Sequence, residues 1–281
     1  MRILFDAHTH FNNEGHSKEK RKELFEEVKN SEVRYAMDSA FDLESSQVAI
    51  NHSEEYDFCF ATVGIHPHEA NKLDDASLLL LEELAKKEKV KAIGEIGLDF
   101  YRNLSPEEEQ KVAFRKQIQL ANKLKMPIVI HARDADREVM DVLIEEGAFS
   151  DERKSCFPKR KDQDGNEVAD ARVLLHCFSG SREFAKEYIA LGATISVGGT
   201  LTYKNNKKTR SVVSGIPIEF LTIETDAPYL TPEPLRGKEN KVPYVKYVAE
   251  KIAEIKDMTY EEVARTTCQN AMRFFNIKES E

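Results

Sequence analysis

The sequence predicts an α/β fold and, within that class, a TIM-like (β/α)8 barrel. Short runs rich in Val, Ile and Leu alternate with longer amphipathic segments from end to end of the chain. Near-continuous apolar strands are typical of a parallel sheet that helices cover on its faces. The alternation repeats eight times in 281 residues, which suits a barrel of roughly 250 residues with insertions. A doubly wound open sheet is the alternative, because the pattern alone does not determine the number of strands.

Eight apolar runs have the composition of buried strands, with β-branched and aromatic residues enriched and turn-forming residues at their ends. The predicted strands are residues 3–8, 33–39, 57–64, 91–95, 127–131, 172–177, 193–198 and 220–225.

Seven amphipathic segments between these runs are predicted helices. Before one of them, Ser105 is a good N-cap residue, Pro106 suits the first helical position, and acidic residues follow in the first turn. In another, Leu78, Leu81 and Ala85 have the spacing of a helix with one apolar face. The predicted helices are residues 17–30, 42–54, 74–89, 105–124, 135–147, 181–191 and 205–214, followed by two closing helices within 243–276.

One polar stretch, residues 149–171, interrupts this rhythm. It is rich in charged residues and contains the turn signal Asp164-Gly165. Because it lies between a helix and the next strand, a barrel would place it on the face opposite the active site. We expect a solvated insertion or a small hairpin within a single domain that spans residues 1–281.

The composition predicts a soluble cytoplasmic protein. The formal net charge is −9 and the pI about 5.5, which disfavours non-specific nucleic-acid binding through a broadly cationic surface. The four cysteines form no CxxC pair, as expected of reduced thiols. The N-terminus shows no signal-peptide pattern, and no apolar run reaches the ~18 residues of a membrane span. We expect no membrane partner and favour a monomer.

Polar residues that can bind a cation stand at or near the ends of the predicted strands. In a parallel barrel these positions converge on one rim, where such barrels carry their chemistry. In the first strand, two histidines one residue apart point to the same side. The strand-end residues are His8, His10, His66, Glu95, His131, Arg133, His176 and Asp226.

These side chains predict a metal centre. Neutral imidazole suits Zn or Mn, and carboxylate also suits Mg. A single histidine at a strand end is more often a structural residue, but five of the eight histidines end predicted strands. Six ligand candidates exceed one tetrahedral site, so we expect two divalent ions with Glu95 between them. The predicted ligands are His8, His10, Glu95, His131, His176 and Asp226.

Six motifs resemble the TatD family of metal-dependent deoxyribonucleases within the amidohydrolase superfamily. They occur in order between residue 6 and about residue 240, and the closing segment also looks like the C-terminal helices of that family. The motifs are DAHTHF, VGIHPHEA, AIGEIGLDFYR, PIVIHARDA, LLHCFSG and ETDAPYLTPEP, the last followed by RGK and Asn240.

The resemblance implies a TIM-like barrel with two metal ions. It assigns His8, His10, Glu95 and Asp226 to the first ion, and Glu95, His131 and His176 to the second. Asp226 would also be the general base, which makes Asp226 and Glu95 the expected catalytic residues. The family usually has an acid and a proline after Asn240, where this chain has Lys241-Val242-Pro243, and its link at 149–171 is shorter.

The expected substrate is DNA, as single strands or strand ends, hydrolysed with the 3′-to-5′ exonuclease polarity that the resemblance implies. The expected phosphate contacts are His66, Arg133 and Lys204, with Lys207, Lys208 and Arg210 nearby. Tyr101, Phe178 and Tyr229 could stack on a base. The alternatives are hydrolysis of a small phosphoester, lactone or aminoacyl ester, because one fold and metal centre serve many substrates, and a non-catalytic metal-binding protein.

Overall fold

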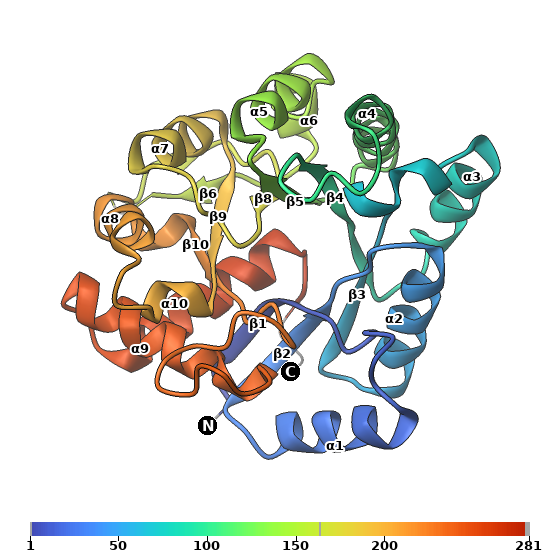
Figure 1. Cartoon of the computed structure of the whole chain (residues 1–281). Helices are drawn as coiled ribbons and strands as arrows, with labels where there is room; N and C mark the ends of the chain where they lie inside the picture. The colour runs from blue at the N-terminus through green and yellow to red at the C-terminus, as the bar shows by residue number, and fades with distance from the viewer. Residues whose placement is uncertain (1, 163, 279–281) are drawn as a thin grey trace.

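Eight parallel strands form a nearly closed barrel with helices around its outside, in a computed structural model that describes residues 2–162 and 164–278 (Figure 1). Neighbouring strands follow one another along the chain without the reversal of order that defines a doubly wound sheet. The predicted TIM-like barrel is therefore confirmed. In order around the barrel, the strands are β1 (Leu4–Thr9), β2 (Val33–Asp38), β3 (Cys59–Val63), β4 (Val90–Asp99), β5 (Ile128–Arg133), β8 (Val173–Leu175), β9 (Thr194–Val197) and β10 (Leu221–Ile223).

The helices connect successive strands and bury an apolar stripe against the barrel. No helix in the described ranges is long and apolar enough to cross a membrane. The α-helices are α1 (Lys18–Lys29), α2 (Leu43–Glu55), α3 (Asp75–Leu84), α4 (Glu107–Leu124), α5 (Asp136–Glu145), α6 (Asp151–Ser155), α7 (Arg182–Leu191), α8 (Lys207–Gly215), α9 (Val245–Lys256) and α10 (Tyr260–Phe274). The short 3₁₀ segments are η1 (Pro67–Lys72), η2 (Gly199–Thr202), η3 (Ile218–Phe220) and η4 (Val242–Tyr244).

Most predicted helix boundaries lie within two residues of the observed ones, and two of the differences have a physical reason. Helix α4 begins at Glu107, with Pro106 rather than Ser105 as its N-cap, because the Ser105 hydroxyl donates to the carbonyl oxygen of His68 instead (2.8 Å). Helix α3 ends at Leu84 rather than at residue 89, because the chain has to turn before β4 can begin at residue 90.

Strand β4 is longer than predicted, and this changes the position of Glu95. The prediction ended the strand at residue 95, whereas it continues to Asp99. Gly97 makes this continuation compatible with β5, since a Cβ atom at residue 97 would collide with the carbonyl oxygen of His131. Glu95 therefore lies in the middle of the strand, and Asp99 lies on the same face four residues later.

The first and last strands meet beyond the end of β10. They are not neighbours in the sheet order, but the Asp226 N–H donates to the carbonyl oxygen of His8 (2.9 Å) and the His10 N–H donates to that of Ala227 (2.8 Å). These bonds place Asp226 beside His8 of β1 and His10, which directly follows that strand.

A buried carboxylate reinforces the same junction. Asp6 accepts hydrogen bonds from the Thr225 N–H (2.9 Å) and the Thr225 hydroxyl (2.5 Å), and it has no solvent exposure. The chain segment that carries His8 is thus tied to the segment that carries Asp226.

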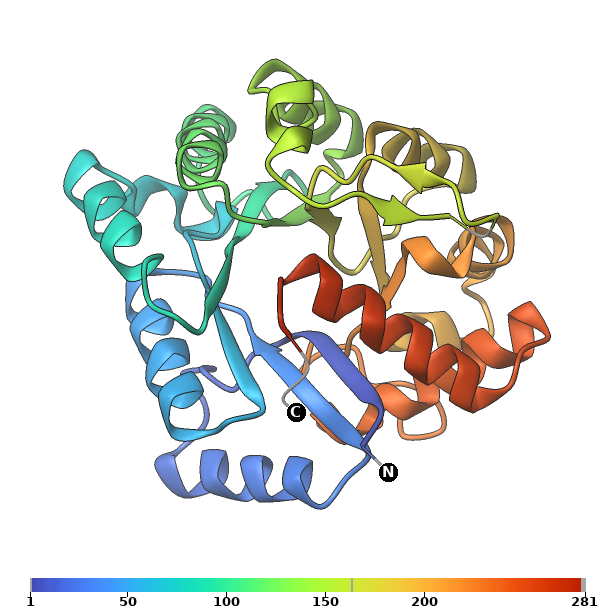
Figure 2. The same ribbon diagram turned by 180° about the vertical axis from the view of Figure 1, so that it is seen from behind.

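The polar stretch 149–171 lies at the opposite end of the barrel. It contains α6 and an antiparallel hairpin of β6 (Arg160–Lys161) and β7 (Glu167–Val168). Figure 2 shows this hairpin, in yellow-green, and α10, in red, on the same side of the molecule. Buried Arg153 attaches the stretch to the barrel by donating to the carbonyl oxygens of Ala171 (2.9 Å) and Met126 (2.8 Å), each shortly before a strand.

We predict that Arg153→Met lowers the free energy of unfolding by about 2–4 kcal/mol, because it leaves buried carbonyl oxygens without a donor. Urea denaturation measures this change. Catalytic rates should be unaffected, since Arg153 is far from the C-terminal ends of the strands. The control is Lys159→Gln, whose exposed side chain forms one ion pair with Glu167 and should change stability by less than about 0.5 kcal/mol. An equally small effect of Arg153→Met would contradict this account.

Candidate metal centre

A cleft of about 760 Å³ opens at the C-terminal ends of the strands. Most of the predicted ligands line it, and His8 lies fully buried beneath. The cleft-lining ligands are His10, Glu95, His131, His176 and Asp226. The expected convergence of strand ends thus appears as a single concave site.

The two carboxylate oxygens of Glu95 face different histidines. Oε2 lies 3.2 Å from Nε2 of His8 and 3.8 Å from Nε2 of His10. Oε1 lies 2.8 Å from Nδ1 of His131 and 2.9 Å from Nε2 of His176. Glu95 therefore stands between two groups of imidazoles, as a bridging ligand would.

The first group lies where β1 meets the end of β10. Nε2 of His10 is 3.3 Å from Oδ1 of Asp226, and Nε2 of His8 is 4.0 Å from the same atom. One ligand atom from each of these three residues lies within 4.8 Å of the others. His8 and His10 reach the same place because alternate residues of a strand share a face.

The second group includes a residue that the sequence placed elsewhere. Nε2 of His66 lies 3.5 Å from Oε1 of Glu95, and His66, Glu95 and His131 form a further group with ligand atoms within 4.8 Å of one another. His66 was expected to contact a phosphate. The structure brings it to the same carboxylate oxygen that faces His131 and His176.

Other buried groups hold the imidazoles from behind, and two of them are carboxylates that sequence reasoning missed. Oδ2 of Asp99 lies 3.3 Å from Nε2 of His131 and 2.7 Å from Nε2 of His68. Oε1 of Glu224 lies 3.2 Å from Nδ1 of His176. Such partners fix the tautomer and orientation of a histidine and leave its other nitrogen free to bind a metal.

His10 is held in a comparable way by a backbone group, since its Nδ1 lies 2.8 Å from the carbonyl oxygen of Ser39. The signal that could have identified Asp99 and Glu224 is their spacing. Asp99 lies four residues after Glu95 on the same face of β4, and Glu224 lies two residues before Asp226.

Burial and neighbouring charges shift the pKa values of His10 and Glu95 in opposite directions. Burial alone would lower the pKa of His10, but the hydrogen bond with Asp226 and the charges of Asp226 and Glu95 raise it to about 9. Burial alone would raise the pKa of Glu95, but the charge of His176 and the hydrogen bond with His131 hold it well below its usual range. Glu95 is therefore ionised at neutral pH.

Two other histidines remain neutral because they are buried. Burial lowers the pKa of His66 to about 3 and also lowers the pKa of His8. Neither ring nitrogen of His8 forms a hydrogen bond within the described structure, although Nε2 points toward Glu95. An unpartnered imidazole nitrogen in a buried polar cluster has the chemistry of a ligand for a cation.

Only some of the predicted substrate-binding residues line the cleft. Arg133 lines the cleft, and its guanidinium carbon lies 4.1 Å from the centre of the exposed Tyr101 ring. Tyr229 also lines the cleft, whereas Phe178 is buried. Lys204, Lys207 and Lys208 are exposed and Arg210 is half-buried, and none of the four lines the cleft.

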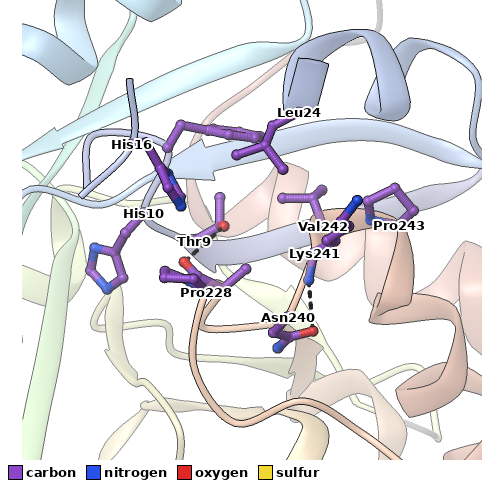
Figure 3. A pocket seen from close by; sticks show the side chains of 11 residues that line it. Thr9, His10, His16, Leu24, Pro228, Asn240, Lys241, Val242 and Pro243 are labelled. Carbon is purple, nitrogen blue, oxygen red and sulfur yellow. Dashed lines mark hydrogen bonds between the residues drawn. The ribbon is translucent and has the colours of Figure 1, made fainter. Parts of the chain in front are cut away.

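A much smaller cavity, of about 10 Å³, lies behind His10 (Figure 3). This is about the space of one water molecule. The side chain of Asn240 donates to the carbonyl oxygens of Thr225 (2.8 Å) and Tyr229 (2.6 Å), on either side of Asp226. Lys241, where the chain departs from the family pattern, pairs with Glu27 (2.5 Å) and contacts no predicted ligand.

The comparisons with known proteins agree with this fold and with the predicted family. The metal-dependent hydrolase YabD of Bacillus subtilis, named as uncharacterized, is 42% identical over 275 residues, which cover 98% of this chain and 100% of that protein. The 3′-5′ ssDNA/RNA exonuclease TatD of Erwinia tasmaniensis is 31% identical over 84% of this chain and 85% of its own length.

A solved structure supports the same relationship. The crystal structure of YjjV, a TatD homologue from Escherichia coli K12, matches with a TM-score of 0.84 and 27% identity, and the match covers 99% of both chains. The model of the family described as TatD related DNase matches residues 5–276. This chain therefore belongs to the TatD-related DNase family.

Proposed function

We propose that this protein is a metal-dependent hydrolase that cleaves phosphodiester bonds of DNA at strand ends, with 3′-to-5′ exonuclease character. The observation that carries the proposal is the position of Glu95, whose two oxygens face different histidines. Bound between those residues, two divalent ions would activate water and neutralise charge on the phosphate, which is the chemistry that phosphodiester hydrolysis requires.

The residues present fit two such ions. His8, His10, Glu95 and Asp226 would hold the first, and the unpartnered ring nitrogens of His8 support this assignment. Glu95, together with His131 and His176, would hold the second. Magnesium, manganese and zinc are all compatible with this mixed set of nitrogen and oxygen ligands.

His66 fits the second ion better than a phosphate. Its lowered pKa keeps the imidazole neutral, so it offers a lone pair to a cation rather than a positive charge to an anion. Its Nε2 also lies 3.5 Å from the oxygen of Glu95 that faces His131 and His176. We therefore add His66 to the proposed ligands of that ion.

Asp226 is the proposed general base. Burial alone would raise its pKa, but the hydrogen bond with His10 and the charges of His176 and His10 lower it, so the carboxylate is ionised and able to accept a proton. In the proposed reaction a water oxygen bonds to phosphorus, the bond from phosphorus to the leaving oxygen breaks, Asp226 takes a proton of the water, and the leaving oxygen gains a proton from solvent to become a hydroxyl group.

The shape of the site favours strand ends. A cleft of about 760 Å³ lies within the range of small-ligand pockets, about 300–1,000 Å³, so it suits one terminal segment better than a long duplex. Relatives named 3′-5′ ssDNA/RNA exonuclease support the same polarity. The second candidate is hydrolysis of a small phosphoester or carboxylic ester, which a pocket of this size also accommodates.

The test is degradation of single-stranded DNA by purified protein with Mg²⁺ or Mn²⁺, with and without a chelator. Stepwise loss from a 5′-labelled oligonucleotide is expected, and a 5′-phosphorylated mononucleotide should be released. A closed circular single strand should survive. Cleavage of the circle would exclude the exonuclease mode, and hydrolysis of small esters without any DNA degradation would favour the second candidate.

We predict that Asp226→Asn lowers kcat on single-stranded DNA by roughly 10²–10⁴-fold, as expected when a general base is lost. Steady-state nuclease assays at saturating metal measure this change. The matched control is Asp151→Asn, at the opposite end of the barrel, which should retain the wild-type rate. Full activity in Asp226→Asn would show that this carboxylate is not required, and would favour a non-catalytic role for the centre.

We also predict that metal binding releases protons and strengthens as the pH rises. Because the pKa of His10 is raised to about 9, the ring carries a proton at neutral pH that a cation has to displace. Affinity should therefore increase between about pH 6 and pH 9. Calorimetric titrations in buffers of different ionisation enthalpy should detect release of about one proton or more per protein. Affinity that is independent of pH would contradict the assigned ligand.

A further inference from the structure

The loops around the cleft differ in charge. Among the described residues that line it, the lysines and arginines are Lys72, Arg102 and Arg133. Lys72 ends η1 after β3, Arg102 follows β4, and Arg133 is the last residue of β5. All three therefore come from consecutive strands on one side of the barrel.

Two of these cations have no counter-charge. Lys72 pairs with Glu69 and lies 3.9 Å from Asp42, so its charge is already compensated. Arg102 and Arg133 form no ion pair with any described residue. Both are exposed and line the cleft. The guanidinium carbon of Arg133 lies 4.1 Å from the centre of the Tyr101 ring, and neither guanidinium group donates a hydrogen bond to another described residue.

The two arginines are positioned by the same strands that carry the predicted metal ligands. Arg133 lies two residues after His131, on the same face of β5, and its partner in the β4–β5 register is Asp99. The carboxylate of Asp99 also accepts a hydrogen bond from the backbone N–H of Arg102 (2.8 Å). Asp99 thus fixes the start of the Arg102 loop and holds the ring of His131.

We propose that Arg102 and Arg133 bind a second phosphate of the substrate, next to the phosphate that is hydrolysed. The guanidinium group suits this role because its planar array of N–H donors matches phosphate oxygens in pairs. This inference rests on the proposed phosphodiesterase function. The proposed substrates are nucleotide chains that contain at least two phosphates. The second phosphate is either the neighbouring backbone phosphate or a terminal phosphate.

The experiment compares kcat/KM of the metal-loaded enzyme on three dinucleotides, TpT, pTpT and TpTp. They share one cleavable diester and differ in the presence and side of a second phosphate. The wild type should cleave one of the two phosphorylated forms about 10–100-fold better than TpT, the range expected for hydrogen bonds to a charged group. Which form is preferred identifies the side on which the second phosphate binds.

Substitution then tests the two side chains. Arg102→Gln and Arg133→Gln should each lose at least about tenfold more kcat/KM on the preferred form than on TpT, and Arg102→Lys should recover part of the difference. The control is Arg265→Gln, an exposed position on α10, which should leave all three values unchanged. Thermal melting of each variant verifies folding.

The experiment distinguishes failure of the second-phosphate site from failure of the proposed function. Equal cleavage of the three dinucleotides by the wild type, or equal losses on all three in the arginine variants, would overturn the second-phosphate site while leaving the phosphodiesterase function intact. Failure of the metal-loaded wild type to cleave any dinucleotide or DNA would instead overturn the proposed function on which the inference rests.

Discussion

The buried carboxylate of Glu95 is the interaction on which the C-terminal end of the barrel depends. With 4% of its surface exposed, an ionised carboxylate is costly unless positive groups compensate it. The compensation comes from His10, His131 and His176, whose imidazole pKa values are raised and whose ring nitrogens each lie within 4 Å of a Glu95 oxygen. The strands can end in histidines at this place because each imidazole faces the same central charge, and a divalent cation would satisfy these groups together.

Buried carboxylates behind the imidazoles support this arrangement. Asp99 and Glu224 hold His131 and His176 by their other ring nitrogens, and Asp6 ties the β1 segment to Thr225 next to Asp226. Residues more than 200 positions apart in the sequence therefore share one rigid site. The opposite end of the barrel, with α10 and the hairpin that follows α6, is attached through backbone carbonyls and is free to vary without disturbing the ligands.

Much of the fold and of the candidate metal centre could be predicted because a parallel barrel brings the C-terminal ends of its strands together. Once the alternation indicated the fold, His8, His10, His131, His176 and Asp226 needed no further information to be placed together. Asp99 was missed because the apparent end of β4 preceded its real end by four residues, and only its spacing from Glu95 pointed to it. Lys204 also follows a predicted strand, but its side chain does not line the cleft, and its position after the strand could not reveal this.

The charge of the cleft explains how an acidic protein could act on an acidic polymer. Carboxylates outnumber lysines and arginines among the residues that line it; they are Glu14, Asp42, Glu69, Glu95, Asp99 and Asp226. Without cations such a surface repels phosphate, so bound metal ions would supply affinity as well as chemistry. The uncompensated guanidiniums then lie on one side only, after β4 and β5. A substrate would be attracted along that side and repelled elsewhere, which orients a strand end at the metals without requiring a basic surface on the whole protein.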